Sequence, residues 1–103
     1  TTQTGLRSPL ARSASKTTWA PAGIAFKSNS LYFTGLRGQS VYAMPLSADG
    51  TPGTIQAFFR TEYGRLRAMT RGPDGALYFS TSNRDGRGTP KTGDDQIIRW
   101  MVP

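Results

Sequence analysis

The chain has 103 residues, a length that suits one small domain or part of a larger one. Thirteen Lys and Arg residues against six Asp and Glu give a formal net charge of +7 at pH 7. The sequence has no Cys and no His, which excludes thiol chemistry and removes the commonest general base and metal ligand.

The first segment, residues 1–18, is rich in Thr, Ser and Arg and poor in large apolar side chains. Such a composition cannot bury enough surface to offset the entropy lost on ordering. We therefore predict a loop or linker at 1–18, followed by the structured region at 19–103. No apolar run approaches the roughly 18 residues that a membrane helix needs, so no membrane span is predicted.

From residue 19 onward, short apolar or aromatic runs alternate with turn residues. The 12 Gly and 7 Pro residues favour many short elements joined by tight turns. No segment of about ten or more residues carries a 3.6-residue apolar period, so an all-β chain with almost no helix is predicted. The predicted strands are 22–26, 31–35, 40–46, 55–60, 65–70, 77–82 and 96–102.

A weak internal repeat groups these strands. The sequence SLYFT at 30–34 recurs as ALYFS at 76–80, an offset of 46 residues. A period of roughly 40–50 residues with about four short strands is typical of a propeller blade, which is stable only when neighbouring blades stack on it. In the first copy, Leu31 and Phe33 should lie on one face and Tyr32 and Thr34 on the other.

We therefore predict about two blades, four-stranded antiparallel sheets, of a β-propeller. An unrelated small sandwich or barrel is the alternative. The second module shows only three strands before the chain ends, and a terminal blade is often completed by a strand from the other terminus. We accordingly expect a C-terminal fragment of a larger domain, with the remaining blades outside this chain.

Several stretches in series carry a more specific signal. They are GRLRAM at 64–69, GPDGALY at 72–78, TSNRDGRG at 81–88 and DDQIIR at 94–99, preceded by PAGIA at 21–25 and GLRGQ at 35–39. This series resembles the C-terminal region of the soluble glucose/sorbosone (aldose sugar) dehydrogenases that depend on pyrroloquinoline quinone (PQQ). The resemblance covers most of the chain, from about residue 19 to 99.

The resemblance implies a six-bladed propeller that binds PQQ and calcium at the mouth of its channel and oxidises aldose sugars to lactones. In that family a base takes the proton of the sugar C1 hydroxyl while hydride passes to the quinone. The catalytic His and the calcium ligands belong to earlier blades. The resemblance therefore implies no catalytic residue and no metal ligand here, no turnover by this chain alone, and a periplasmic or secreted parent protein.

Three cofactor contacts carry over from the family motifs. The R-x-R motif is present as Arg65 and Arg67, whereas the L-K-G motif reads Leu36-Arg37-Gly38, with Arg37 in place of Lys. Arg37 keeps the positive charge but replaces a point ammonium with a planar fork. The resemblance also places Trp19 near the substrate pocket.

The residues also support an anion site without the family. Arg65 and Arg67 stand two apart on a predicted strand, so both side chains should point to one face. Two guanidinium groups on one face repel each other unless an anion lies between them, and a carboxylate can bind such groups in bidentate fashion. A solvated face, or pairing with an acid such as Glu62, is the alternative. Arg37 could likewise be an ordinary exposed turn residue.

Other interpretations stay open at this point. Asn83, Asp94 and Asp95 bring oxygen ligands to one long loop, but Asp and Asn also serve turns, which we favour over calcium. The aromatic residues are better explained by strand packing than by stacking on nucleic acid, because the basic residues are scattered. A non-catalytic propeller-like binding module, for a sugar or a protein partner, is the alternative to a dehydrogenase fragment.

Overall fold

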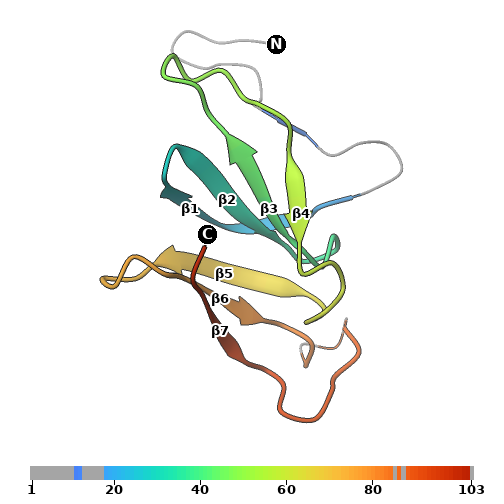
Figure 1. Ribbon diagram of the computed structural model, residues 1–103. Coiled ribbons are helices and arrows are strands. Elements are labelled where there is room, and N and C mark those ends of the chain that lie inside the picture. Colours follow the sequence, from blue (N-terminus) through green and yellow to red (C-terminus); the bar gives the residue numbers. More distant parts are fainter. Residues whose placement is uncertain (1–10, 13–17, 85, 87, 103) are drawn as a thin grey trace, which may run out of the picture.

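The computed structural model describes residues 11–12, 18–84, 86 and 88–102. These residues form seven β-strands and no helix (Figure 1). Every predicted strand is present, which confirms the all-β class, although the strand predicted at 55–60 shrinks to three residues. The strands are β1 (Pro21–Lys27), β2 (Ser30–Gly35), β3 (Val41–Pro45), β4 (Gln56–Phe58), β5 (Leu66–Arg71), β6 (Leu77–Thr81) and β7 (Ile97–Trp100).

The strands form two antiparallel sheets in chain order, β1-β2-β3-β4 and β5-β6-β7. The arrangement in about two blade-like sheets is therefore confirmed, with four strands in the first and three in the second. Tight turns explain the simple order. Ser28 and Asn29 adopt positive φ angles of 51° and 63°, which suits the two-residue turn between the paired ends of β1 and β2.

The core lies between the two sheets (Figure 1). Alternation along β2 decides which face contributes to it. Tyr32 belongs to the buried cluster, whereas Leu31 and Phe33 line a groove with Ile24 and Met44 on the opposite face of the same sheet. The predicted facing of β2 is thus confirmed. The buried cluster consists of Tyr32, Val41, Ala43, Leu66, Met69, Leu77 and Phe79.

A β-bulge interrupts the pairing of β5 with β6. Leu66 pairs with Thr81 and Met69 with Phe79, so three steps along β5 match two steps along β6. In a regular strand Leu66 and Met69 would face opposite sides, because their spacing is odd. The extra residue turns both side chains into the core, where Leu66 is 0% and Met69 8% exposed. The sequence pattern did not predict this bulge.

The predicted linker at 1–18 falls mostly outside the described residues. Of that segment the structure describes Ala11, Arg12 and Thr18, none of which lies in a strand. The division into a linker and a blade region therefore stays a prediction. In the described part of the chain, no helix is long and apolar enough to cross a membrane.

Trp100 on β7 joins the two sheets through aromatic contacts. Its ring centroid lies 5.7 Å from that of Tyr32, 5.0 Å from Phe58 and 4.9 Å from Phe59, in tilted or edge-on geometries. Such pairs are worth about 0.5–1.5 kcal/mol each beyond the area they bury. Strand β7 thus packs against the first sheet and pairs with β6.

We predict that Trp100→Ala lowers the free energy of unfolding by about 3 kcal/mol, because it removes these ring contacts and leaves a cavity. Urea denaturation of the 103-residue chain measures the change. Ile97→Ala is the matched control on the same strand, since Ile97 is 78% exposed and its loss should cost less than about 0.5 kcal/mol. Equal losses for the two variants would contradict the role given to Trp100.

The turn between β5 and β6 contains one carboxylate that accepts several hydrogen bonds. Asp74 accepts hydrogen bonds from the Tyr78 hydroxyl at 2.8 Å, the Ala76 amide at 3.0 Å and the Arg99 Nε at 2.9 Å. These donors, the Tyr78 hydroxyl first, lower the pKa of Asp74 from 3.8 to about 2. The carboxylate is therefore stabilised in its charged form.

Because the pKa of Asp74 is lower in the folded than in the unfolded chain, the charged carboxylate stabilises the fold at pH values above 3.8. This contribution to stability is lost as the pH falls through about 2. We expect an NMR titration of the Asp74 carboxyl to show a midpoint near pH 2. Tyr78→Phe removes the largest cause and should return the midpoint toward 3.8. An unchanged midpoint in that variant would show that the hydroxyl does not set the pKa.

Candidate functional site

The three predicted Arg residues lie at one end of the two sheets. Arg37 is exposed in the turn after β2, Arg65 directly precedes β5, and Arg67 is the second residue of β5. Two hydrogen bonds join these segments. The Thr34 hydroxyl donates to the Arg67 carbonyl at 2.6 Å, and the Thr61 amide donates to the Gln39 carbonyl at 2.8 Å. The end of β2 and the start of β5 are therefore neighbours (Figure 1).

Arg65 and Arg67 converge on a single residue at the end of β6. The Arg65 Nε donates to the Ser82 carbonyl at 3.2 Å, and the Arg67 Nε donates to the Ser82 hydroxyl at 3.3 Å. The two side chains thus run to the same side, as their spacing predicts. Arg65 is half-buried, Arg67 is exposed and Ser82 is 6% exposed. Two guanidinium groups on a rigid strand end are suited to binding an anion.

Asn83 anchors the chain that leads into β5. Its side chain is 2% exposed, accepts from the Arg65 amide at 2.9 Å, and donates to the Tyr63 carbonyl at 2.8 Å. Gly64 makes this close approach possible, because a Cβ there would lie 2.4 Å from the Asn83 Oδ1. Its φ of 77° also favours glycine. The backbone position of Arg65 is therefore set by a buried amide.

Two carboxylates in the loop before β7 support this arrangement. Asp95 accepts from the Asn83 amide at 2.7 Å and from the Thr81 hydroxyl at 3.2 Å. Asp94 accepts from the Lys91 amide at 2.8 Å and from the Asn83 side-chain amide at 3.1 Å. These bonds satisfy loop donors, as Asp does in turns. Within the described residues, no three His, Cys, Asp or Glu side chains gather as a metal site would require.

The turn that carries Arg37 is held by backbone contacts. The Leu36 amide donates to the Ala20 carbonyl and the Gly38 amide to the Trp19 carbonyl, both at 3.0 Å. A Cβ at Gly38 would lie 2.1 Å from the Tyr42 hydroxyl oxygen, so only glycine fits without rearrangement. Exposed Arg37 thus stands on a turn of fixed shape.

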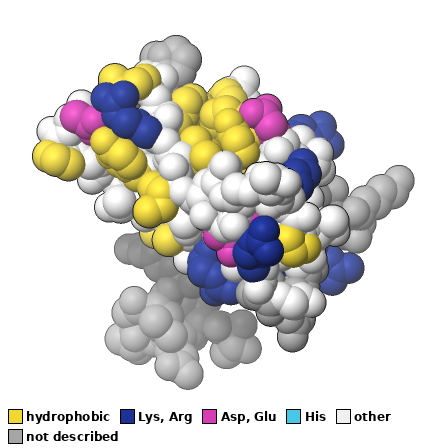
Figure 2. All heavy atoms as spheres, turned by 90° about the horizontal axis from the view of Figure 1, so that it is seen from below, with side chains coloured by type: hydrophobic (Ala, Val, Ile, Leu, Met, Phe, Trp, Pro, Cys, Tyr) yellow, Lys and Arg dark blue, Asp and Glu magenta, His cyan; other side chains and the backbone are white. Residues whose placement is uncertain are grey.

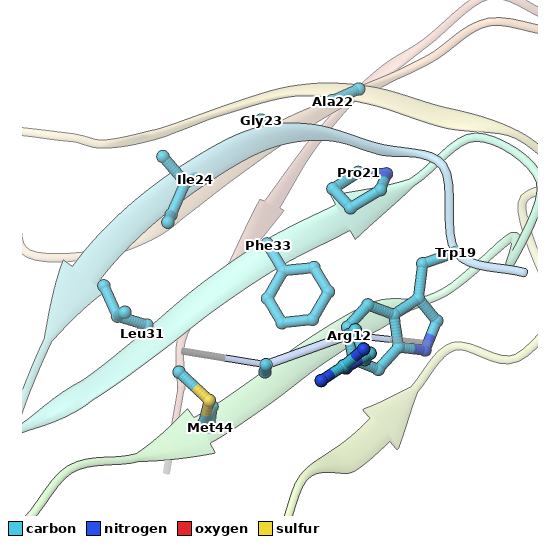
Figure 3. A pocket seen from close by; sticks show the side chains of 10 residues that line it. Arg12, Trp19, Pro21, Ala22, Gly23, Ile24, Leu31, Phe33 and Met44 are labelled. Carbon is cyan, nitrogen blue, oxygen red and sulfur yellow. The ribbon is translucent and has the colours of Figure 1, made fainter. Parts of the chain in front are cut away.

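Trp19 is close to this turn, but its ring points elsewhere. The ring packs at 5.0 Å on Phe33 and at 5.4 Å on Tyr42, on the face of the first sheet that is turned away from the second. There it lines a groove of about 650 Å³ together with Arg12 (Figure 3). The structure therefore does not bring the indole together with Arg65 and Arg67. Its place in a substrate pocket stays a prediction.

Tyr63 lies two residues before Arg65, and no other tyrosine is closer to Arg65 in the sequence. Burial raises the pKa of its hydroxyl above 10.0, and the neighbouring Glu62 adds to the rise. The raised pKa disfavours the phenolate form of Tyr63.

Basic residues are dispersed outside the Arg65–Arg67 pair. Figure 2 shows one face, on which the Lys and Arg side chains form separate groups with acidic and hydrophobic side chains between them. Arg99, for example, forms an ion pair with Asp74 at 2.9 Å. The described residues form no continuous basic surface on this face.

Sequence reasoning missed the residues that hold the Arg pair, namely Thr34, Ser82 and Asn83. All three are polar and at most 6% exposed. The sequence held one signal for Thr34. It is a polar residue in an otherwise apolar strand, and it was predicted to lie on the face opposite Leu31 and Phe33. The polar run Thr81-Ser82-Asn83 likewise begins at the last residue of β6. Only the contacts show which donors these side chains meet.

Solved structures of two bacterial proteins resemble the chain closely. The PQQ-bound aldose sugar dehydrogenase of Streptomyces coelicolor is 40% identical, with a TM-score of 0.80 over 94% of this chain and 29% of that one. A putative oxidoreductase (glucose dehydrogenase) of Thermus thermophilus is 39% identical, with a TM-score of 0.81 over 92% of this chain and 28% of that one. A further glucose dehydrogenase, 20% identical with a TM-score of 0.74, shares the fold.

The chain thus spans less than a third of the length of these solved relatives. No curated protein sequence matches it. The sequence model of the glucose/sorbosone dehydrogenase family matches residues 1–99, nearly the whole chain. With this match and two relatives near 40% identity at TM-scores of 0.80 and 0.81, the chain belongs to the glucose/sorbosone dehydrogenase family.

Proposed function

We propose that this chain is a C-terminal part of a PQQ-dependent sugar dehydrogenase that oxidises aldoses to lactones, and that it supplies Arg contacts to the cofactor. The observation that carries the proposal is the convergence of Arg65 and Arg67 on Ser82, at the sheet end where the Arg37 turn lies. The S. coelicolor relative is PQQ-bound, which supports PQQ as the anion.

The chemistry of the donors fits this cofactor. PQQ carries three carboxylates, and guanidinium groups bind carboxylates through charge-assisted and often bidentate hydrogen bonds. Arg65 and Arg67 would hold one side of it, because Asn83 holds the Arg65 amide and Ser82 accepts a hydrogen bond from the Nε of each. Arg37 would add a third positive charge from its turn. When bound, PQQ supplies the oxidant that accepts hydride from the sugar.

The chain's own residues would bind and orient, and the base would come from elsewhere. The sequence has no His, the commonest general base. We therefore propose that the chain alone has no dehydrogenase activity. The base and the calcium ligands would lie on other blades, Trp19 would border the sugar pocket, and the parent protein would be periplasmic or secreted.

The outer face of the first sheet supports the presence of further blades. Ile24 is 61% and Phe26 50% exposed there, beside the groove lined by Leu31, Phe33 and Met44. A sheet with apolar residues on both faces suits a blade that has a neighbour on each side. The remaining blades of the propeller would cover this face.

We predict that Arg65→Ala and Arg67→Ala each weaken PQQ binding by about tenfold to a hundredfold, because each removes charge-assisted hydrogen bonds worth roughly 1.5–3 kcal/mol. The test uses the longest polypeptide that the gene encodes, freed of cofactor and titrated with PQQ by fluorescence quenching. Arg71→Ala is the control, since Arg71 is an exposed guanidinium at the far end of the same strand.

Unchanged affinity in both variants would overturn the proposed cofactor role. Sugar binding without any PQQ binding in the parent protein would favour the non-catalytic binding module instead. Oxidation of an aldose by the cofactor-loaded parent, with none by the 103-residue chain, is the result expected for the activity.

A further inference from the structure

A buried hydroxyl connects the two sheets beside the Arg pair. Thr34 on β2 is 0% exposed. Its Oγ1 accepts a hydrogen bond from the Gly23 amide of β1 at 2.9 Å and donates one to the Arg67 carbonyl of β5 at 2.6 Å. One side chain therefore links three strands. One of its two hydrogen-bond partners is the backbone carbonyl of Arg67, a proposed cofactor ligand.

Both partners of Thr34 lie where the regular strand pairing breaks. The β1–β2 register shifts between Pro21 and Gly23, and the β5–β6 register shifts between Leu66 and Met69. Backbone groups at a bulge lose their ladder partners and must find others. The Thr34 hydroxyl serves one such group from each bulge.

A second hydroxyl holds the bulge from the other side. The amide of Ala68, the residue after Arg67, donates to the Ser80 Oγ of β6 at 3.1 Å. The peptide unit between Arg67 and Ala68 is thus held at its carbonyl by Thr34 and at its amide by Ser80. Its orientation is fixed by two side chains from neighbouring strands.

The backbones of β1 and β5 also touch at this point. A Cβ at Gly23 would lie 2.5 Å from the Met69 amide nitrogen and 2.8 Å from the Arg67 carbonyl oxygen. Figure 3 shows Gly23 on β1, with the ribbon of β5 running alongside. Gly23 therefore permits the approach that brings Thr34 within reach of the Arg67 carbonyl.

We propose that Thr34 and Ser80 are positioning residues for the anion site, because their hydroxyls set the orientation of the bulge from which the Arg67 side chain starts. The proposal rests on the proposed function, since it takes the cofactor as the anion. A rotation of this peptide unit would swing the Arg67 guanidinium away from Ser82. A displacement of about 1 Å would take a guanidinium hydrogen bond outside the usual donor–acceptor range of roughly 2.7–3.2 Å.

The test compares variants of the longest polypeptide that the gene encodes, with PQQ as the probe. Thr34→Val keeps the shape but removes the hydroxyl, whereas Thr34→Ser keeps the hydroxyl. Ser80→Ala removes the second hydroxyl at a half-buried position and should leave the fold intact. Dissociation constants are measured well below the melting temperature of each variant, and the melting temperatures are recorded separately.

We expect Thr34→Val and Ser80→Ala to weaken PQQ binding about tenfold, and Thr34→Ser to bind within about twofold of the unaltered protein. Lower melting temperatures with unchanged affinity would overturn the proposal and leave a role in stability alone. Equal losses in Thr34→Val and Thr34→Ser would also overturn it, because the hydroxyl would not be the cause.

Two further outcomes separate this proposal from the proposed function. If Thr34→Val does not fold, Ser80→Ala decides alone, and unchanged affinity in that variant overturns the proposal. If Arg65→Ala and Arg67→Ala leave the affinity unchanged as well, the cofactor role itself is overturned. If those two weaken binding while Thr34→Val and Ser80→Ala do not, only the positioning role is lost.

Discussion

The structure depends on the contact between the backbones of β1 and β5. Side chains usually keep packed sheets about 10 Å apart, but at Gly23 the two main chains meet directly. This close approach requires a residue without a Cβ on β1. It also relies on the buried Thr34 hydroxyl, which accepts a hydrogen bond from the Gly23 amide and donates one to the Arg67 carbonyl. The hydrophobic cluster packs between the two sheets, and Trp100 of β7 contacts Tyr32, Phe58 and Phe59 of the first sheet and the segment that follows it.

The backbone of the candidate site is held by hydrogen bonds beside the contact between β1 and β5. Arg65 and Arg67 do not stand on a free loop, because Asn83 holds the amide of the first and Thr34 the carbonyl of the second. Long basic side chains lose conformational entropy on binding a ligand, and a fixed backbone with anchored Nε groups reduces that loss. The loop before β7 contributes indirectly, since Asp94 and Asp95 hold Asn83 in place. The packing between the sheets and the geometry of the candidate site therefore have common causes.

The sequence identified most of the fold and the charged part of the site. Alternation and turn residues located all seven strands, and the repeat of SLYFT as ALYFS separated the two sheets. The R-x-R spacing indicated that Arg65 and Arg67 run to the same side.

The sequence did not predict the bulge in β5, because a bulge arises when one sheet is fitted onto another. Local periodicity treats 65–70 as a regular strand, whereas the core requires both Leu66 and Met69. The place of Trp19 in a substrate pocket stays a prediction, and its ring packs on Phe33 and Tyr42 at the outer face.

The sequence by itself determined the secondary structure, the family and the Arg residues of the candidate site, because these follow from periodicity, turn chemistry and motif spacing along the chain. Only the tertiary structure decided which polar groups hold those Arg residues. Thr34, Ser80 and Asn83 are 33, 12 and 18 residues away from the residues whose backbone they hold. Contacts at such separations depend on how the sheets pack. A hydroxyl or an amide can serve any nearby donor or acceptor, so its partner is defined only once packing has excluded water and the other candidates.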